Sequence, residues 1–412
     1  MNTPTDTRTD PRRWPDVARA PHAPLRAGIA STLMRRIAGR VPLRVETPNG
    51  SVGPEGLPLL RLHRPQTFLN RIGTGGLIGF GEAYQARDWD TDDLPRLLTA
   101  LAAHIDTLVP APLQRLRKPF ARRGPRTEDN TRANARRNIA EHYDLSDDLF
   151  ALFLDPTMTY SAALFGGAEG TWDDLAEAQR RKIDRLLDRT DVGPGTRVLE
   201  IGTGWGELAT RAAERGATVH TITLSENQLR RAKALATERG VAQHITAELR
   251  DYRDLDPARR YDAVLSVEMI EAVGERYWPE YFATLHRSLA PGGKIGLQAI
   301  TMRHDRMKAT RGGYTWIHKY IFPGGIIPSL PAIEQHTHHA GLRITDQLAF
   351  GRDYARTLKL WRERFTAQSH RLATLGFDDT FRRTWEFYLA YSQAGFATDY
   401  LDVRQLILEA RP

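Results

Sequence analysis

The stretch of sequence that decides the fold is residues 196–216, TRVLEIGTGWGELATRAAERG. Its first part, TRVLEIG, is a short apolar run typical of a buried strand, and ELATRAAERG has the composition of a helix. Gly202, Gly204 and Gly206 stand between them. Glycines at this spacing let the backbone turn sharply and approach a ligand, because no Cβ stands in the way. The stretch predicts a ligand-binding strand–loop–helix unit, with a purely structural tight turn as the plainer alternative.

Strand-like and helical segments alternate along the chain from residue 138 onward. The other strand-like runs are ATVHTITL (217–224), YDAVLSV (261–267), GKIGLQAI (293–300) and RITDQLAF (343–350). The helical segments are 173–188, 226–239, 276–289 and an aromatic-rich stretch at 361–391. Parallel strands need crossover helices, so this alternation predicts an α/β fold with a Rossmann-like, doubly wound sheet and helices on both faces.

The acidic residues around the glycines indicate which ligand the loop takes. A dinucleotide site usually has G-x-G-x-x-G and an acid about 20 residues later, at the end of the second strand. Here the spacing is G-x-G-x-G, and the second strand ends in Thr-Leu-Ser at 223–225. An acid, Glu200, precedes the glycines instead, and Asp251 and Tyr252 follow the third strand. This layout resembles the S-adenosylmethionine (SAM) methyltransferases, while a nicotinamide-dependent oxidoreductase is the alternative.

Six motifs in a fixed order make the resemblance specific. They are EHYDLSDDLFALFLDPTMTYSAALF (141–165), VLEIGTGWG (198–206), ITLSENQ (222–228), DYRDL (251–255), SVEMIEAVG (266–274) and KYIFPGG (319–325). Together they resemble the cyclopropane fatty acid synthase and mycolic acid methyltransferase family. Residues 65–95 are similar to the small N-terminal domain of its phospholipid-acting branch. VEMIEAVG, QAITM and the late AYSQAGFATDYLDV are most similar to actinobacterial members linked to methyl-branched, tuberculostearic-type fatty acids.

The resemblance implies a set of SAM contacts and a bicarbonate bound in the active site. The SAM contacts are Tyr160, Ser161, Glu200, Gly202, Gly204, Gly206, Thr223, Leu224, Gln228, Asp251 and Tyr252. The bicarbonate, which takes up a proton in that family, would be held by Glu271, Tyr354, Gln298 and the backbone of Ile300. Two positions depart from the family, because Ala162 replaces a Cys and Gln298 replaces a His. An altered anion site is therefore expected.

The implied reaction is methyl transfer from SAM to the C=C of an oleoyl-type acyl chain of a phospholipid. Attack leaves a carbocation, which a bare carboxylate would trap as an ester, so an apolar and aromatic site is expected. Ring faces stabilise a cation by roughly 0.5–2 kcal/mol each. The candidate rings are Tyr314, Trp316, Tyr320 and Phe322, of which Tyr320 is the predicted catalytic one, and core packing is an equally good interpretation of each. A 10-methylene product is expected, and a cyclopropane product remains the alternative.

Charge and composition limit which binding partners and which cysteine or metal sites are expected. The 58 basic and 50 acidic residues leave a net charge of +8, which suits an anionic membrane surface or nucleic acid. The motif typical of nucleic-acid methyltransferases near the fourth strand is replaced by SVEMIEAVG, so no nucleic-acid partner is expected. The absence of cysteine excludes disulfides, thiolate metal sites and cysteine catalysis. His336, His338 and His339 lack acids at ligand spacing, so no metal site is expected.

Four segments are expected along the chain. They are a disordered tail at 1–25, a small α+β lipid-binding domain at 26–108, a basic linker at 109–137 and the SAM-dependent domain at 138–412. Between Arg115 and Arg137 there are nine basic residues and two acids, which predicts either a solvated linker or a strip that lies on anionic lipid. With no secretory signal and no transmembrane run of about 18 apolar residues, a cytoplasmic protein at the inner membrane surface is expected. Pairing of subunits, and a reductase partner that completes a saturated branch, stay open.

Overall fold

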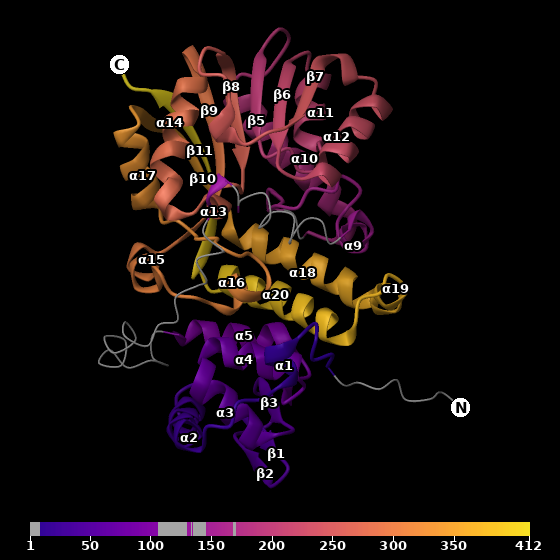
Figure 1. The fold of residues 1–412 in the computed structure, drawn as a ribbon, viewed down its shortest axis with the longest axis vertical. Helices are drawn as coiled ribbons and strands as arrows, with labels where there is room; N and C mark the ends of the chain where they lie inside the picture. Colours follow the sequence, from indigo (N-terminus) through magenta and orange to yellow (C-terminus); the bar gives the residue numbers. More distant parts are fainter. Residues whose placement is uncertain (1–8, 106–129, 133, 135–145, 168–169) are drawn as a thin grey trace. The chain divides into compact units, whose positions relative to one another are not determined.

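The computed structural model describes residues 9–105, 130–132, 134, 146–167 and 170–412, and the chain forms two compact units (Figure 1). The larger unit comprises Arg123–Gly313, Phe322–Leu360 and Asp399–Pro412. The smaller unit comprises Met1–Arg122, Tyr314–Ile321 and Trp361–Thr398. The boundaries therefore differ from the expected ones, because two segments of the expected SAM-dependent domain group with the N-terminal part of the chain.

The larger unit is built on a seven-stranded sheet, and the prediction of a doubly wound α/β fold is confirmed (Figure 1). In sheet order the strands are β10 (Leu342–Ala349), β11 (Leu401–Ala410), β9 (Leu289–Met302), β8 (Tyr261–Val267), β5 (Arg197–Ile201), β6 (Thr218–Thr223) and β7 (Ile245–Leu249). The five strands from β9 to β7 pair in parallel. β11 runs antiparallel to both β9 and β10, and it was not predicted.

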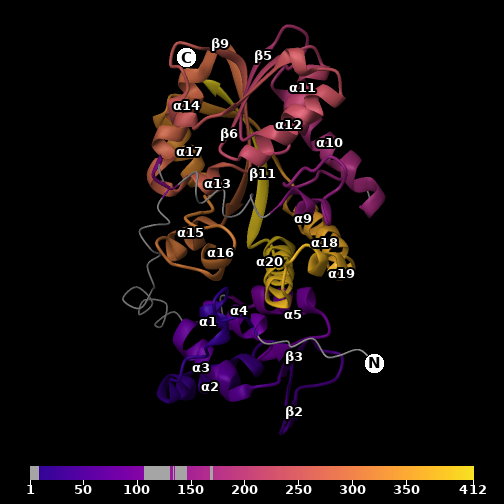
Figure 2. The same ribbon diagram turned by 45° about the vertical axis from the view of Figure 1, so that its right-hand side comes forward.

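Helices cover both faces of this sheet (Figure 2). On one side lie α10 (Trp172–Arg189), α11 (Glu207–Glu214) and α12 (Glu226–Glu238), and on the other α13 (Ile270–Val273), α14 (Trp278–Ser288) and α17 (Leu330–His339). Successive side chains of a strand point to opposite faces. Accordingly Val198 of β5 belongs to the core beneath α10 and α11, whereas Leu199 belongs to the core beneath α14 and α17.

The order of the strands creates a binding edge. The chain leaves β5 for β6 and β7, then returns to the other side of β5 as β8. Ligands of open α/β sheets bind beyond the carboxyl ends of the strands at such a reversal. The loops that follow β5, β6, β7 and β8 therefore meet where a ligand is expected.

Shorter elements complete the larger unit. They are α9 (Asp147–Ala151), α15 (His304–Thr310), the first part of α18 (Gly351–Ala367) and three 3-10 helices, η2 (Ala242–His244), η3 (Tyr252–Asp254) and η4 (Glu275–Tyr277). The basic linker and the HYDL segment at 142–145 lie outside the described residues, apart from 130–132 and 134 of the linker. No helix in the described part of the chain is long and apolar enough to cross a membrane.

The smaller unit has a four-stranded sheet in the order β2-β1-β3-β4 and a set of helices. The strands are β1 (Arg44–Thr47), β2 (Gly50–Val52), β3 (Leu59–Leu62) and β4 (Trp89–Asp90). The helices are α1 (Pro15–Ala18), α2 (Pro24–Ala38), α3 (Pro65–Gly75), α4 (Leu77–Gln85), α5 (Leu94–Ala103), α16 (Trp316–Tyr320), the part of α18 from Trp361 onward, α19 (Ser369–Thr374) and α20 (Asp379–Ala397). Its core is aromatic: Trp89, Trp361 and Phe365 are fully buried.

The prediction of a disordered tail is wrong for α1 and the start of α2. Val17 of α1 is 1% exposed. The guanidinium of Arg71 donates hydrogen bonds to the carbonyl oxygens of Asp16 and Val17, at 2.8 and 2.5 Å. These tertiary contacts order a proline-broken segment whose local sequence has little helical preference.

Candidate active site

One pocket of the larger unit opens at the carboxyl edge of the sheet, among the loops that follow β5, β6, β7 and β8. Every residue that the sequence assigned to SAM lines it: Tyr160, Ser161, Glu200, Gly202, Gly204, Gly206, Thr223, Leu224, Gln228, Asp251 and Tyr252. We call it the donor pocket. Its location agrees with the general placement of ligands in doubly wound sheets.

The glycine loop depends on its glycines for conformation and for space. Gly202 and Gly206 have φ angles of 100° and 99°, which residues other than glycine rarely adopt. A Cβ on Gly206 would lie 2.8 Å from Cα of Ala232 in α12. Trp205 anchors the loop by donating a hydrogen bond from its indole nitrogen to Oδ1 of Asp147, at 2.9 Å. The loop is thus held close to α12 and leads directly into α11.

Polar groups of the donor pocket are held by neighbours within the larger unit. Thr221 donates a hydrogen bond to Oε2 of the buried Glu200 at 2.5 Å, and burial raises the pKa of Glu200 to about 8. Asp251 accepts two hydrogen bonds from the guanidinium of Arg253, at 2.8 and 2.6 Å. These contacts fix the side chains at the ends of β5 and β7, which suits a polar ligand such as the amino-acid and ribose parts of SAM.

Lys182 is a cation beneath this pocket that the sequence reasoning missed. Its side chain lies on α10, is 1% exposed, and donates a hydrogen bond to Oγ of Ser161 at 2.6 Å. Burial lowers the pKa of Lys182 to about 8, opposed by the charges of Glu268, Asp155 and Glu200. A single Lys in a helix gives no sign in the sequence that it lies near a ligand pocket, because only the fold brings it there.

Two of the predicted anion-binding residues, Gln298 and Tyr354, donate hydrogen bonds to a carboxylate of the chain itself. Oε1 of Glu268 accepts hydrogen bonds from the backbone N–H of Ala162, at 2.9 Å, and from Nε2 of Gln298, at 2.8 Å. Oε2 of Glu268 accepts one from the hydroxyl of Tyr354, at 2.7 Å. Glu268 follows β8 and contributes to the wall of the donor pocket. Glu268 is therefore a hydrogen-bonded carboxylate, not a bare one, in a site that was expected to be apolar and aromatic.

Glu271, the predicted bicarbonate ligand, lies close to this group. Its Oε1 accepts a hydrogen bond from the backbone N–H of Ile300, and its buried Oε2 has no partner among the described residues. Burial, followed by the charge of Glu268, raises the pKa of Glu271 to about 8. Glu271 therefore holds its proton at neutral pH, whereas the three donors of Glu268 favour the ionised form of that side chain.

The residues present do not fit a bound bicarbonate. The side chain of Gln298, the hydroxyl of Tyr354 and the N–H of Ala162 all donate to Glu268. The backbone of Ile300 donates to Glu271. A bicarbonate here would compete for these donors and would place a second negative charge beside a carboxylate, which is unfavourable in a site of low polarity. The donors expected around the bicarbonate therefore all bind carboxylates of the chain itself.

Comparison with known proteins decides the family. Residues 130–406 match the model of the mycolic acid cyclopropane synthetase family. The chain belongs to this family. Over 98% of its length it is 53% identical to tuberculostearic acid methyltransferase UfaA1 of Mycobacterium tuberculosis, of which the match covers 97%. It is 33% identical to the cyclopropane-fatty-acyl-phospholipid synthase of Escherichia coli, over 84% of this chain and 87% of that one.

A solved structure agrees with this placement. Mycolic acid cyclopropane synthase CmaA1, in complex with S-adenosylhomocysteine (SAH), is 30% identical to this chain with a TM-score of 0.60. The match covers 69% of this chain and 98% of that one. The chain is a SAM-dependent methyltransferase, and the oxidoreductase alternative is set aside.

The predicted aromatic residues of this methyltransferase do not form one group around the donor pocket. Tyr314, Trp316 and Tyr320 belong to the smaller unit, whereas Phe322 belongs to the larger one. Trp316 donates from its indole nitrogen to Oε1 of Gln85 at 3.0 Å and is buried. The hydroxyl of Tyr320 donates to Oε1 of Glu82 at 2.9 Å. Core packing accounts for Trp316, and a catalytic role for Tyr320 stays a prediction.

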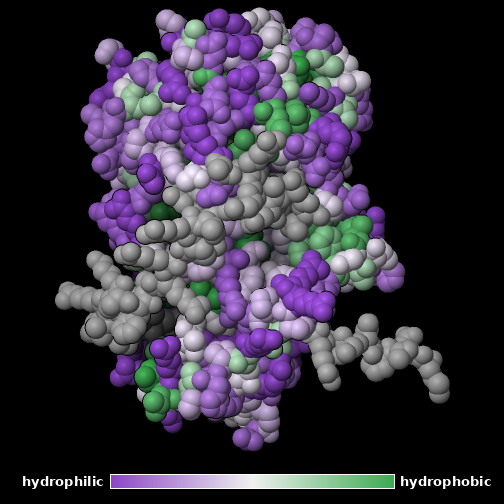
Figure 3. Space-filling view, in the orientation of Figure 1, coloured by the Kyte–Doolittle hydropathy of each residue, from purple (hydrophilic) through white to green (hydrophobic). Residues whose placement is uncertain are grey.

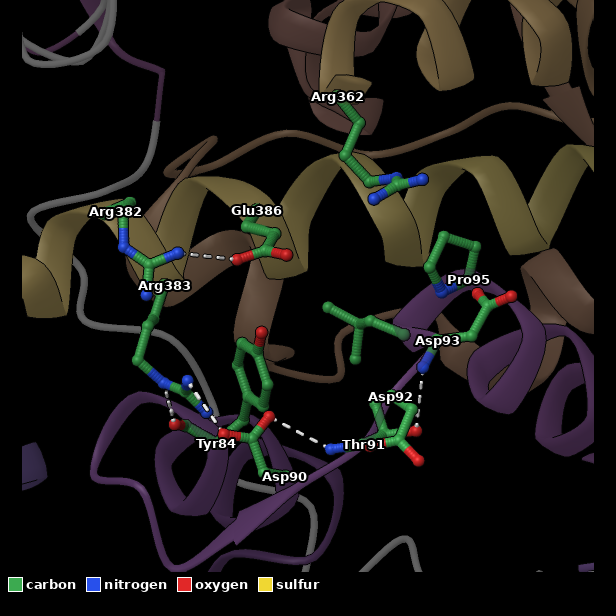
Figure 4. Close-up of a pocket in the computed structure, with 11 residues that line it drawn as sticks. Tyr84, Asp90, Thr91, Asp92, Asp93, Pro95, Arg362, Arg382, Arg383 and Glu386 are labelled. Carbon is green, nitrogen blue, oxygen red and sulfur yellow. Dashed lines mark hydrogen bonds and ion pairs between the residues drawn. The ribbon is translucent and has the colours of Figure 1, made fainter. Parts of the chain in front are cut away.

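A second hollow lies in the smaller unit of this chain, between α20, α18 and the segment at 90–95 (Figure 4). Two of its three arginines are already paired: Arg382 with Glu386 at 3.0 Å, and Arg383 with Asp90 at 3.4 Å. Arg383 also lies over the ring of Tyr84, 3.8 Å from its centre. Its four carboxylates, those of Asp90, Asp92, Asp93 and Glu386, outnumber its three arginines. This hollow is therefore ill suited to a lipid phosphate.

Proposed function

We propose that this methyltransferase transfers the methyl group of SAM to the C=C of an oleoyl-type acyl chain of a phospholipid, and that the product is a 10-methylene branch. The observation that carries the proposal is a donor pocket with a hydrogen-bonded carboxylate, Glu268, in its wall. A methyl transfer that creates a carbocation needs a proton acceptor beside the donor. The relative at 53% identity, named a tuberculostearic acid methyltransferase, supports a branched product over a cyclopropane.

The chemistry of an isolated alkene sets what the chain must supply. SAM, when bound, offers a methyl group on a sulfonium. The glycine loop and the groups at Thr223, Asp251 and Tyr252 would hold it. An alkene is a weak nucleophile, so most of the rate must come from proximity, orientation and exclusion of water. The resulting cation loses a proton from the new methyl group. If the proton leaves at once, the methyl carbon bonds to the cationic carbon and a cyclopropane closes. If a hydride first moves from the methylated carbon to the cationic carbon, the same loss leaves an exocyclic methylene.

The test is incubation of the full chain with methyl-deuterated SAM and vesicles of dioleoyl phospholipid. Gas chromatography–mass spectrometry of the released fatty acids separates methylene from cyclopropane products by retention time. Deuterium in a 10-methylene chain is the expected result. Deuterium only in a cyclopropane would overturn the branched product, and unlabelled acyl chains would overturn the function itself.

The smaller unit carries a surface that fits the anionic membrane where such a substrate lies. On α2, Leu25 is 88% and Ile29 is 72% exposed, one helical turn apart (Figure 3 shows apolar surface over this helix). Arg26, Arg35 and Arg36 of the same helix are exposed as well. Apolar side chains next to cations are typical of a helix that lies in the interface of an anionic bilayer. We infer that α2 docks the enzyme on the inner membrane surface.

Two further partners remain proposals. A saturated methyl branch requires reduction of the exocyclic C=C, so the enzyme class that would consume the proposed product is a reductase. Pairing of two copies of the chain is the other. Co-purification with a reductase and measurement of the molar mass in solution test these two points.

A further inference from the structure

We propose that the carboxylate of Glu268 is an internal base, which takes the place of a bound bicarbonate and accepts the proton that leaves the carbocation. The inference rests on the proposed function and identifies the residue that completes its chemistry. Three donors from segments far apart in the sequence bind the carboxylate of Glu268. They are the N–H of Ala162, Nε2 of Gln298 and the hydroxyl of Tyr354. These are positions that the family resemblance assigns to bicarbonate.

The backbone at Glu268 is held in an unfavourable conformation. Its φ angle is 48°, in the left-handed region that favours glycine. Such a conformation in another residue costs about 1–3 kcal/mol and persists only where the surroundings determine it. Here the N–H of Glu268 donates to the carbonyl oxygen of Gln298 at 2.8 Å, which ties the end of β8 to β9. A glycine would relieve the strain, so retention of a glutamate points to a use for its side chain.

Gln298 is oriented so that it donates to a carboxylate. Its Oε1 accepts a hydrogen bond from Nε2 of Gln405 at 3.1 Å, which turns its NH2 group toward Glu268. Gln405 is in turn fixed by Arg185, whose guanidinium donates to Oε1 of Gln405 at 2.8 Å. A primary amide is neutral and does not take up a proton at ordinary pH. Gln298 therefore holds the base without competing with it for the proton.

Burial favours the protonated form of Glu268, whereas its hydrogen-bond donors and the charge of Lys182 favour the ionised form. Burial raises the pKa of Glu268, while the donor at Ala162 N–H, the charge of Lys182 and the hydroxyl of Tyr354 oppose that rise. Three donors occupy about three of the four lone-pair positions of a carboxylate, which leaves one to receive a proton. The same donors make the carboxylate a weaker nucleophile, so that it abstracts a proton rather than forming an ester with the cation.

The proposed step balances without any added reagent. The π electrons of the C=C form a bond to the transferred methyl carbon as the sulfur–carbon bond breaks, which leaves a neutral thioether and a carbocation. A hydride moves from the methylated carbon to its neighbour, so the positive charge lies on the carbon that bears the methyl group. The methyl group then loses a proton to the carboxylate of Glu268, and its C–H electrons form the exocyclic C=C. The carboxylic acid of Glu268 releases that proton to water after product leaves.

The test compares wild type with Glu268→Gly and Glu268→Gln, in buffer freed of carbon dioxide and with added bicarbonate or formate. Wild type is expected to turn over equally in both buffers. Both variants are expected to lose roughly 10²- to 10⁴-fold in kcat, the usual contribution of a general base. Bicarbonate or formate should restore Glu268→Gly by roughly tenfold or more, because the anion can take the vacated donors. Glu268→Gln keeps the space filled and should not respond.

Controls separate this inference from folding and from the proposed function. Titration calorimetry with SAH should give similar affinities for all forms, and Glu280→Gln on α14 should keep wild-type turnover. If either variant fails to bind SAH, the dependence of the wild-type rate on bicarbonate still tests whether Glu268 is the base. A wild-type rate that falls in carbon-dioxide-free buffer and recovers with bicarbonate would overturn the internal base alone. No label in the acyl chain from wild type in either buffer would overturn the proposed function, and this inference with it.

Discussion

The hydroxyl of Tyr354 donates a hydrogen bond to Oε2 of Glu268 over 2.7 Å, which joins the start of α18 to the end of β8. Tyr354 is 6% exposed, so this bond is shielded from water. This bond sets the direction in which the carboxylate faces the donor pocket. Hydrogen bonds to charged groups contribute about 1.5–3 kcal/mol.

Replacement of Tyr354 by phenylalanine tests this positioning role. We expect kcat to fall roughly tenfold or more, because one bond to a charged group is lost. The affinity for SAH should stay the same, since Tyr354 does not line the donor pocket. Loss of the donor also raises the pKa of Glu268, so the acid limb of the kcat–pH profile should move to higher pH. Tyr281→Phe, which removes a bond to Ser266, is the control, and an unmoved profile in Tyr354→Phe would count against the role.

The raised pKa of Glu271 predicts how stability depends on pH. Its ordinary value is 4.5 and its folded value about 8, so the folded chain holds a proton that the unfolded chain releases in this window. The contribution is fully present below pH 4.5 and is lost as pH rises through 8, so the unfolding free energy falls across the window. In Glu271→Gln this fall should be smaller. Calorimetric midpoints from pH 5 to 9 measure it, and parallel curves for variant and wild type would contradict the assignment.

Gly206→Ala should weaken SAH binding and destabilise the fold. The new Cβ would lie 2.8 Å from Cα of Ala232, and the φ angle of 99° is strained for alanine. We expect a loss of about 2–4 kcal/mol in unfolding free energy. Gly240→Ala is the matched control, because its φ is 70° but its Cβ has nothing within 4 Å. Denaturant unfolding and SAH calorimetry separate the two effects, and equal losses at both positions would exclude the clash as their cause.

Leu25→Ser together with Ile29→Ser should weaken binding to anionic vesicles. Burial of one such side chain is worth about 1.5–3 kcal/mol, so the affinity should fall at least roughly tenfold. Because both side chains are more than 70% exposed in the free protein, the unfolding midpoint should not change. Leu375→Ser, at a leucine that is 38% exposed outside α2, serves as the control. Sedimentation with phosphatidylglycerol vesicles measures binding, and unchanged binding of the double variant would rule out docking through α2.

The strands at the centre of the larger sheet were predictable because their signal is local. β5, β6, β8 and β9 are mostly buried, so each carries a run of apolar or β-branched residues. β11 was missed, since it carries Arg404 and the buried Gln405 among its apolar residues. That glutamine is accommodated only because Arg185, Lys182 and Gln298 satisfy its amide in the folded chain. No window of sequence around β11 contains these partners.

By itself the sequence predicted which residues gather in one pocket at the carboxyl edge of the sheet. The glycine loop, the acid before it and the polar turns after the next strands each lie within a few residues of a strand end, and all eleven assigned residues line the donor pocket. The tertiary structure alone decided which group accepts the hydrogen bonds of Gln298 and Tyr354. Glu268 meets Ala162, Gln298 and Tyr354 only after segments from residue 162 to residue 354 have packed together. A strand–loop motif is a property of neighbouring residues, whereas a partly buried carboxylate and its donors depend on long-range packing, which a linear pattern does not encode.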